Sequence, residues 1–263
     1  MALKWIFRIF FAFSVALFFA CSSPTSGETG VLECPECSVK GSSAAEKSSS
    51  STEQSSSGAE NLTLTWIATS AFSISQTEIM QVDYAALMGT LPLQMPQAIG
   101  DSFPVSNVSW YDAVLFANAL SKYMGLDTAY SYTSVGAGNK IVGLKVDLNA
   151  NAVRLPTGEE WEFAARAGTT GSYYWGTDKA SDYAQYNNLT DSYQETAQKK
   201  PNAWDLYDVS GNVAEWTNDT TLRGGNWTSV AKELALDKSE KELPDYASTT
   251  TGIRVILISK NEP

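Results

Sequence analysis

A sixteen-residue run in the C-terminal part of the chain carries the residue types best suited to chemistry. Residues 201–216 read PNAWDLYDVSGNVAEW and combine turn-forming residues and aromatics with two acids, Asp208 and Glu215. The run is too polar for a buried strand and too rich in Trp and Tyr for an ordinary loop. A tight loop that holds carboxylate and carbonyl oxygens close together provides what a hard cation such as calcium needs. The run therefore predicts a cation-binding loop, which the rest of the chain must position.

The N-terminal segment predicts export and a lipid anchor. Lys4 and Arg8 precede an apolar stretch, 9–20, that ends directly before Cys21. A basic start, a short apolar stretch and a small residue before the cut are typical of a secretory signal, and the stretch is short for a membrane span. A Cys directly after the cut indicates a bacterial lipoprotein acylated at Cys21, and several acyl chains on one Cys anchor stably. The alternative is an ordinary signal peptide, 1–20, followed by a chance Cys.

Residues 21–61 have the composition of a disordered, serine-rich tether. They contain few aromatic or branched apolar residues, and serine runs at 48–51 and 55–57 dominate them. Such a segment cannot bury enough apolar surface to offset its chain entropy. Cys34 and Cys37 form a C-x-x-C pair within it. Because no second pair and no histidine accompany them, a local disulfide, or no role, is favoured over a redox or metal motif.

Residues 62–263 have the length of one folded domain. They hold seven of the eight Trp residues and none of the three Cys residues, so the predicted fold does without disulfides. The net charge of −11 argues against nucleic-acid binding and against direct binding to anionic lipid. The chain is therefore predicted to carry one folded domain on its tether, outside the cytoplasm.

Two capping boxes predict two helices. Ser109 is followed three residues later by Asp112, and Thr157 is followed three residues later by Glu160. An apolar repeat at helical spacing follows each box, and a third helix is expected over 80–88. Elsewhere short apolar runs are separated by long irregular stretches, which usually have a function in a compact domain. The predicted class is α+β with much irregular structure.

Several long motifs follow one another in a fixed order over residues 70–258. They read PVSNVSWYDAVLFANALSK (104–122), VRLPTGEEWEFAARAGT (153–169), YYWG (173–176), PNAWDLYDVSGNVAEW (201–216), RGGNW (223–227) and Gly252-Ile-Arg254. On these motifs the chain resembles the formylglycine-generating enzyme family, also called sulfatase-modifying factor domains. The resemblance implies a variant of the C-type lectin fold, rich in loops, with few short helices around a small twisted sheet.

The resemblance implies a family chemistry that this chain cannot perform. Active members oxidise a substrate Cys to formylglycine with oxygen and copper, and two thiolates hold the metal because soft sulfur selects Cu(I). A gapless match from RGGNW places Ser229 and Leu234 at the two Cys positions. A hydroxyl and an isobutyl group cannot hold Cu(I), so no copper is expected. Related sulfoxide synthases hold iron with His residues, and this chain has no His. A catalytically silent member is therefore expected.

The calcium ligands of the family match this chain better. Members bind calcium in the loop that ends in G-N-x-x-E-W, which implies the side chains of Asp208 and Glu215 and the backbone carbonyls of Gly211 and Val213 as ligands. The alternative is that Asp208 caps a turn and that Glu215 pairs with an arginine. The candidate arginines are Arg154, Arg166 and Arg223. A second, looser calcium match involves Asn188, Leu189, Asp191 and Tyr193.

The large aromatics invite a sugar-binding hypothesis, because aromatic faces stack on sugar rings. Four Trp residues lie in structural motifs of the resembling family, so core packing is expected for them. They are Trp161, Trp204, Trp216 and Trp227. Tyr173, Tyr174 and Trp175 are better candidates for surface contact with a ligand.

One departure from the resembling family alters the shape of its site. Ala214 stands where the family has a large aromatic residue, which opens space beside Trp216. Such space either lines a pocket or is filled when a neighbour repacks, and repacking is the commoner outcome in cores.

The sequence favours a non-catalytic, surface-anchored lipoprotein of the bacterial cell envelope. Its ligand would be an envelope protein or a glycan, bound through the loops around 170–200 and 226–250. Ser22 and Ser23 carry no acidic retention signal, which favours the outer membrane. A structural component of an envelope or secretion assembly is the first alternative.

The second alternative is an oxidoreductase-type enzyme of the same family with an altered active site. It would have to use Ser229, Asp219 or Glu233. A serine nucleophile needs an adjacent base, and the usual base, histidine, is absent from the chain.

Overall fold

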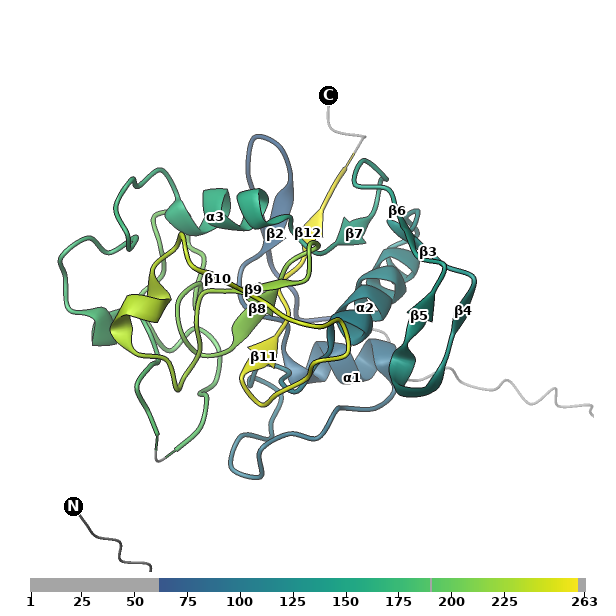
Figure 1. Cartoon of the computed structure of the whole chain (residues 1–263). Helices are drawn as coiled ribbons and strands as arrows, with labels where there is room; N and C mark the ends of the chain where they lie inside the picture. Colours follow the sequence, from purple (N-terminus) through teal and green to yellow (C-terminus); the bar gives the residue numbers. More distant parts are fainter. Residues whose placement is uncertain (1–61, 190, 260–263) are drawn as a thin grey trace, which may run out of the picture. The chain divides into compact units, whose positions relative to one another are not determined.

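The computed structural model of the chain describes residues 62–189 and 191–259 (Figure 1). The predicted signal segment 1–20, the tether 21–61 with Cys34 and Cys37, and the acylation candidate Cys21 lie outside the described residues. Within the described residues, no helix combines the length and apolarity needed to cross a bilayer.

Three α-helices occur, and each agrees with a prediction from the sequence. They are α1 (Gln81–Met88), α2 (Trp110–Tyr123) and α3 (Gly158–Arg166). Both capping boxes form: the Ser109 hydroxyl accepts from Asp112 N at 3.1 Å, and the Thr157 hydroxyl accepts from Glu160 N at 3.2 Å. Such a cap is worth about 1 kcal/mol to its helix. Helix α1 begins after Met80, whose side chain makes no capping hydrogen bond.

The remaining elements are short. Three 3₁₀ turns occupy η1 (Ala137–Asn139), η2 (Ala180–Asp182) and η3 (Ala231–Leu234). The strands are β1 (Trp66–Ala68), β2 (Ser73–Ser75), β3 (Tyr130–Ser131), β4 (Ser134–Val135), β5 (Ile141–Val142), β6 (Lys145–Val146), β7 (Val153–Arg154), β8 (Ala214–Trp216), β9 (Thr221–Arg223), β10 (Ser239–Lys241), β11 (Thr251–Gly252) and β12 (Ile256–Leu257). The described domain is therefore α+β and rich in loops, as the sequence predicts.

Two four-stranded sheets and two ribbons organise these strands. The first sheet has the order β1-β2-β12-β7 and is antiparallel throughout, with Ile256 opposite Ile74. The second has the order β10-β9-β8-β11, in which only β11 runs parallel to its neighbour, β8. Strand β3 pairs with β6 and β4 with β5. The run 201–216 leads directly into β8, so its end is fixed in the interior of the second sheet.

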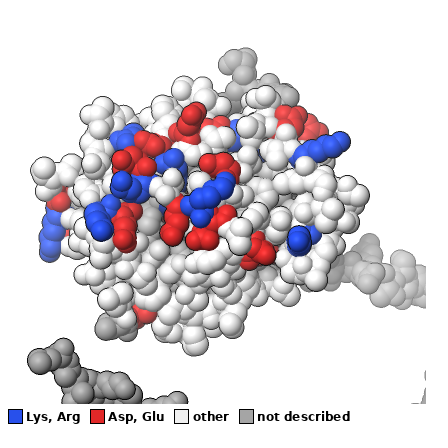
Figure 2. Space-filling view, viewed as in Figure 1, with Lys and Arg blue, Asp and Glu red and all other residues white. Residues whose placement is uncertain are grey.

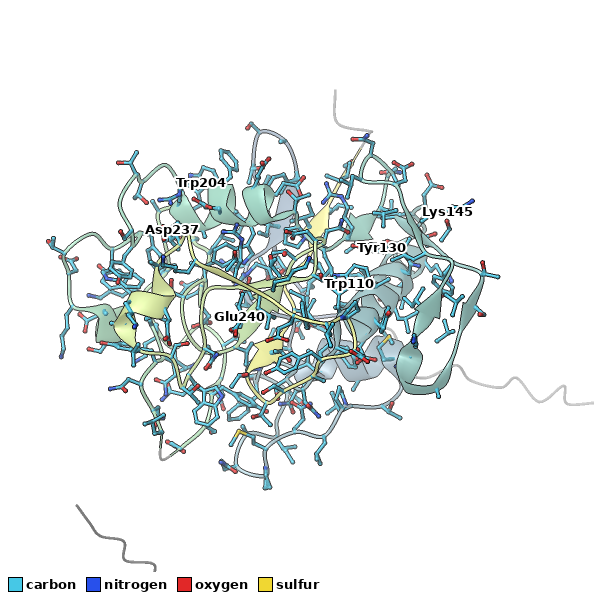
Figure 3. All side chains as sticks on the ribbon, in the orientation of Figure 1. Trp110, Tyr130, Lys145, Trp204, Asp237 and Glu240 are labelled. Carbon is cyan, nitrogen blue, oxygen red and sulfur yellow. The ribbon has the colours of Figure 1, made fainter. Side chains whose placement is uncertain are left out.

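The two largest of three clusters of buried side chains in the described chain hold the sheets and helices together. The larger lies against α2 and includes Phe116, Trp216 and the edge-to-face pair Trp110–Tyr130, whose ring centroids are 6.4 Å apart (Figure 3). The second cluster packs beneath α3 around Trp161. Each such side chain contributes about 1.5–3 kcal/mol when it is fully buried.

The Trp assignment from the sequence is confirmed. Trp161, Trp216 and Trp227 are buried, and Trp204 packs half-buried against the second cluster. None of these four rings is therefore an exposed platform for a ligand.

Candidate functional site

Residues 201–216 are held as a rigid loop by Asn202 at their start. The Asn202 amide donates to the carbonyls of Ala164 and Ala165 at the end of α3, and its oxygen accepts from the backbone N of Leu206 at 3.1 Å. Four residues of the loop adopt a positive φ, which compresses the backbone into a tight path. They are Asp205 (60°), Asp208 (57°), Gly211 (85°) and Asn212 (54°). The loop therefore has the cramped geometry expected of a cation loop.

Glu215, however, is committed to a buried ion pair. Arg254 Nε lies 2.9 Å from Glu215 Oε1 and 3.0 Å from Oε2, and Arg254 Nη2 lies 2.8 Å from Oε1. The Trp161 indole donates to Glu215 Oε2 at 2.5 Å. Both charged side chains are almost fully buried. Although burial alone would lower the pKa of Arg254, the charge of the Glu215 carboxylate raises it above its ordinary value.

The partner of Glu215 differs from the three arginines considered for it. Arg154 pairs with Glu160, and Arg166 and Arg223 both pair with Glu162. Arg254 reaches Glu215 because β11 pairs with β8 in a register that places Gly252 opposite Glu215. The same guanidinium donates to the backbone carbonyls of Ser75 and Tyr207, at 2.8 and 2.6 Å.

Asp208 lies close to this pair and is buried. Its Oδ2 accepts from the backbone N of Ala197 at 2.6 Å. Burial raises the pKa of Asp208 to about 6, against the opposing effects of the Ala197 hydrogen bond and the Arg254 charge. Together with Glu78, which is described next, Asp208 and Glu215 make three buried carboxylates near the single positive charge of Arg254.

Glu78 is the functional-site residue that sequence reasoning missed. It is fully buried, and its carboxylate accepts from the backbone N of Val213 at 2.9 Å and from the Asn212 amide at 2.6 Å. Burial, followed by the charges of Asp208 and Glu215, raises the pKa of Glu78 well above its ordinary value. Its only signal in the sequence is an acid directly before the apolar pair Ile79-Met80.

The calcium assignment meets a specific obstacle in this geometry. Calcium needs six to eight oxygen ligands, with a carboxylate often bound through both of its oxygens. Glu215 uses both oxygens on Arg254 and Trp161. Among the described residues, no three acidic, Cys or His side chains converge as a metal-binding group. Glu215 would therefore have to give up these hydrogen bonds to bind a cation, and calcium binding stays a prediction of the sequence.

A melting experiment decides the calcium question. We expect the protein to melt within about 1 °C of the same temperature in calcium and in chelator, because only a cation that binds the folded state stabilises it. Differential scanning fluorimetry measures the shift. A rise in calcium that Asp208→Asn removes would contradict this expectation and restore the calcium loop.

The side chains of the second calcium match lie in different surroundings, and calcium binding there stays a prediction of the sequence. Leu189 extends into solvent, 75% exposed, while the Tyr193 ring is buried against Phe103. The Tyr193 hydroxyl takes part in hydrogen bonds with Ser106 and Gln94 in the interior. Asp191 lines an open depression of about 510 Å³. Asn188 and Asp191 do not belong to any convergent set of acidic, Cys or His ligands among the described residues.

The assignment of Tyr174 and Trp175 to the surface is wrong. They are only 9% and 8% exposed, because Trp175 is sandwiched between Tyr173 and Tyr183 at centroid distances of 4.8 and 5.8 Å. The Tyr174 hydroxyl donates to buried backbone carbonyls of Tyr183 and Lys200. Tyr173 is half-buried and donates to Ala231 O. The Trp175 faces are thus covered by neighbouring rings and cannot stack on a sugar.

The two positions that hold copper in the resembling family do come together. A methyl group placed on Gly225 would touch both Ser229 Oγ and Leu234 Cδ2. Ser229 Oγ accepts from Asn226 N at 3.1 Å, whereas Leu234 packs fully buried in the second cluster. The alignment of Ser229 and Leu234 with one site is therefore geometrically sound, and their side chains offer no metal ligand of the copper type.

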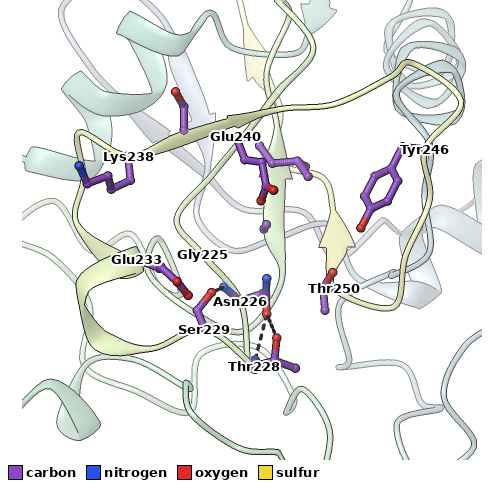
Figure 4. A pocket seen from close by; sticks show the side chains of 12 residues that line it. Gly225, Asn226, Thr228, Ser229, Glu233, Lys238, Glu240, Tyr246 and Thr250 are labelled. Carbon is purple, nitrogen blue, oxygen red and sulfur yellow. Dashed lines mark hydrogen bonds between the residues drawn. The ribbon is translucent and has the colours of Figure 1, made fainter. Parts of the chain in front are cut away.

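A cavity of about 470 Å³ opens directly beside these positions (Figure 4). Ala214 and Leu222, from β8 and β9, supply its aliphatic side chains. Polar residues supply its walls: Asn226, Thr228, Ser229, Glu233, Lys238, Ser239, Glu240, Tyr246 and Thr250. Ala214 thus lines a pocket, whereas Trp216 is fully buried and does not line it.

The three groups considered for an altered active site are not paired with one another in the described chain. Ser229 Oγ accepts a hydrogen bond from a backbone N–H, and no basic side chain is among its hydrogen-bond partners in the described chain. Glu233 caps η3 by accepting from Val230 N at 3.0 Å, and Asp219 accepts from the Thr217 hydroxyl at 2.6 Å, outside the pocket lining. These three groups therefore do not form a nucleophile and base pair.

Comparisons with known proteins agree with the fold. A protein named chaperone protein LppX, from Paenibacillus barcinonensis, is 29% identical over a 293-residue alignment that covers 96% of this chain and 98% of the relative. Inactive C-alpha-formylglycine-generating enzyme 2 of Mus musculus is 35% identical over 133 residues, which cover 38% of this chain and 42% of that relative. The chain thus matches less than half the length of the mouse protein.

A solved structure and a family model complete the comparison. Treponema denticola variable protein 1 superposes with a TM-score of 0.62 at 28% identity, over 71% of this chain and 84% of that chain. The fold is the formylglycine-generating-enzyme variant of the C-type lectin fold, as the motifs predicted. The model of the sulfatase-modifying factor enzyme 1-like domain matches residues 38–258. The chain therefore belongs to the sulfatase-modifying factor enzyme 1-like domain family.

Proposed function

We propose that this protein is a non-catalytic, lipoprotein-type module that binds a polypeptide client in the cavity beside Ser229. The proposal rests on a cavity that opens beside the family's copper position, where neither thiol is present, and that Ala214 and Ser229 line. Lost ligands remove the oxidase chemistry, while the cavity keeps a place for a bound side chain. The nearly full-length similarity to a relative named a chaperone supports a protein client.

Anchoring and location follow the sequence prediction and form part of the proposal. An acylated Cys21 followed by the tether 21–61 would hold the domain at the outer membrane of the cell envelope, free to reach clients near its anchor. The client would be an envelope protein. A glycan ligand is less well supported, because the only aromatic residue that lines the cavity is Tyr246.

Filling the cavity tests the proposal. Ala214→Trp restores a large aromatic of the kind that the resembling family carries there, so we expect a folded protein whose cavity is occupied by its own indole. Fluorescence anisotropy of labelled, reduced and carboxymethylated α-lactalbumin, an unfolded polypeptide, measures client binding to the full chain. We expect Ala214→Trp to weaken binding at least tenfold, which corresponds to about 1.4 kcal/mol.

The matched control adds the same side chain elsewhere. Ala71 lies exposed in the loop between β1 and β2, so Ala71→Trp should bind the client like the unmodified chain. Equal binding by Ala214→Trp and Ala71→Trp would contradict the proposal. An unmodified chain that binds no unfolded polypeptide would favour the structural-component alternative.

A further inference from the structure

The cavity beside Ser229 contains features that select one kind of peptide segment. Its aliphatic residues, Ala214 and Leu222, are largely removed from water. A cavity of about 470 Å³ holds one large apolar side chain with room for a neighbouring group. Burying such a side chain is favourable because it removes apolar surface from water. An apolar residue of the client therefore seats against these two side chains.

Charged groups converge on this cavity from two sides. Figure 4 shows that the Glu240 carboxylate extends into the cavity from β10 and that the Glu233 carboxylate extends into it from η3. The Lys238 amine points away from it in the same view. Glu233, Lys238 and Glu240 are all exposed, so these groups form the rim of the cavity, where two carboxylates accompany one lysine. A cation placed beside the apolar anchor would meet one or both carboxylates.

The polar groups of the cavity are left with unused bonding capacity. Within the residues that the structure describes, the Glu240 carboxylate and the Tyr246 hydroxyl have no hydrogen-bond or ion-pair partner in the chain itself. Glu233 uses Oε2 on Val230 N, and no further partner in the described chain meets Oε1. Free groups on opposite walls are what a bound peptide needs to fix its orientation.

The surface around the cavity extends this acidic bias. Residues 232–245 contain five acids and three lysines, and the Lys241 amine already donates to the carbonyl of Asp219. Figure 2 shows acidic and basic side chains gathered across the middle and upper part of this face, whereas its lower part is almost free of charge. The net charge of −11 adds a long-range attraction for basic segments.

We propose that the cavity recognises client segments in which a large apolar residue is flanked by lysine or arginine. The apolar side chain occupies the space above Ala214 and Leu222, and the neighbouring cation pairs with Glu240. This inference rests on the proposed client-binding function and names the chemistry of the segment that is bound.

Four short peptides test the two halves of this recognition separately. Each has the form acetyl-Gly-X-Z-X-Gly-amide with a fluorescent label, and its binding to the full chain is followed by anisotropy. The series is Lys-Phe-Lys, Gln-Phe-Gln, Glu-Phe-Glu and Lys-Gly-Lys. We expect Lys-Phe-Lys to bind at least tenfold more tightly than Lys-Gly-Lys and than Glu-Phe-Glu.

Charge variants of the chain assign the cation to Glu240. Glu240→Gln should weaken binding of the Lys-Phe-Lys peptide about threefold to fivefold and leave that of the Gln-Phe-Gln peptide unchanged. The control Glu242→Gln removes the same charge two residues away, outside the cavity lining, and should change either affinity by less than about twofold.

The outcomes separate this inference from the function on which it rests. Equal affinity for the lysine and glutamate peptides, equal effects of Glu240→Gln and Glu242→Gln, or no peptide binding at all would overturn the sequence preference. If unfolded α-lactalbumin still binds in an Ala214-dependent manner, the client-binding function stands without it. If that binding is absent or indifferent to Ala214→Trp, the function itself falls.

Discussion

Replacement of Arg254 by methionine is expected to lower the free energy of unfolding by about 3–5 kcal/mol. The guanidinium is fully buried and provides the positive charge for Glu215, with Asp208 and Glu78 nearby. Methionine fills part of its volume but leaves the Glu215 carboxylate buried without a counter-charge. This unpaired buried charge is the main cost of breaking a buried ion pair. Urea denaturation followed by tryptophan fluorescence measures the loss.

A surface pair provides the control for this prediction. Lys200 and Asp182 are 3.2 Å apart, but their side chains are 60% and 44% exposed. Lys200→Met should therefore leave the urea midpoint almost unchanged. The double variant Glu215→Leu with Arg254→Met should be more stable than Arg254→Met alone, because the Glu215 carboxylate is no longer left buried without its partner. A loss below 1 kcal/mol for Arg254→Met would mean that water reaches Glu215, contrary to the geometry.

The second large effect is expected at Gly211, within the loop 201–216. Gly211→Ala should lower the free energy of unfolding by about 3 kcal/mol or more, from backbone strain and steric overlap together. Gly211 has φ of +85°, and a Cβ there would lie 2.2 Å from the carbonyl oxygen of Gln185. That carbonyl is backbone and is held by Asn212 N at 2.8 Å, so it cannot move aside cheaply.

A substitution at Gly168 separates the cost of backbone strain from the cost of steric overlap. Its φ is +88°, like that of Gly211, but no atom lies within 4 Å of the position that a Cβ would occupy. Gly168→Ala therefore carries the strain without the overlap and should cost about 1–2 kcal/mol. Thermal or urea denaturation of both variants gives the comparison. Equal losses at the two glycines would show that overlap with Gln185 adds nothing.

Local features of this fold could be predicted from the sequence because their causes lie within a few residues. The boxes Ser109–Asp112 and Thr157–Glu160 need only a spacing of three, and both form. The opening beside Ala214 is also readable, because a small residue in place of a large one leaves volume wherever it is placed. Whether neighbours fill that volume depends on the whole structure, and here they leave a cavity.

Features that depend on distant chain segments were not readable in the same way. The partner of Glu215 is decided by which strand lies beside β8, and β11 brings Arg254 there from 39 residues away. Glu78 reaches Val213 across 135 residues. The burial of Trp175 depends on Tyr183, whose ring covers it after an intervening turn. Neither the composition nor the residue spacing indicates that these distant residues come into contact.

The position of β12 has a consequence for when the domain can fold. This strand comes from the end of the described chain, yet it lies in the middle of the first sheet, between β2 and β7 (Figure 1). Arg254, just before it, contacts Ser75 across 179 residues. Contacts between such distant segments make folding slow, because the loop must close before they form. The first sheet can therefore be completed only after the segment that contains β12 is available, so the domain cannot finish folding before nearly all of the described chain is present.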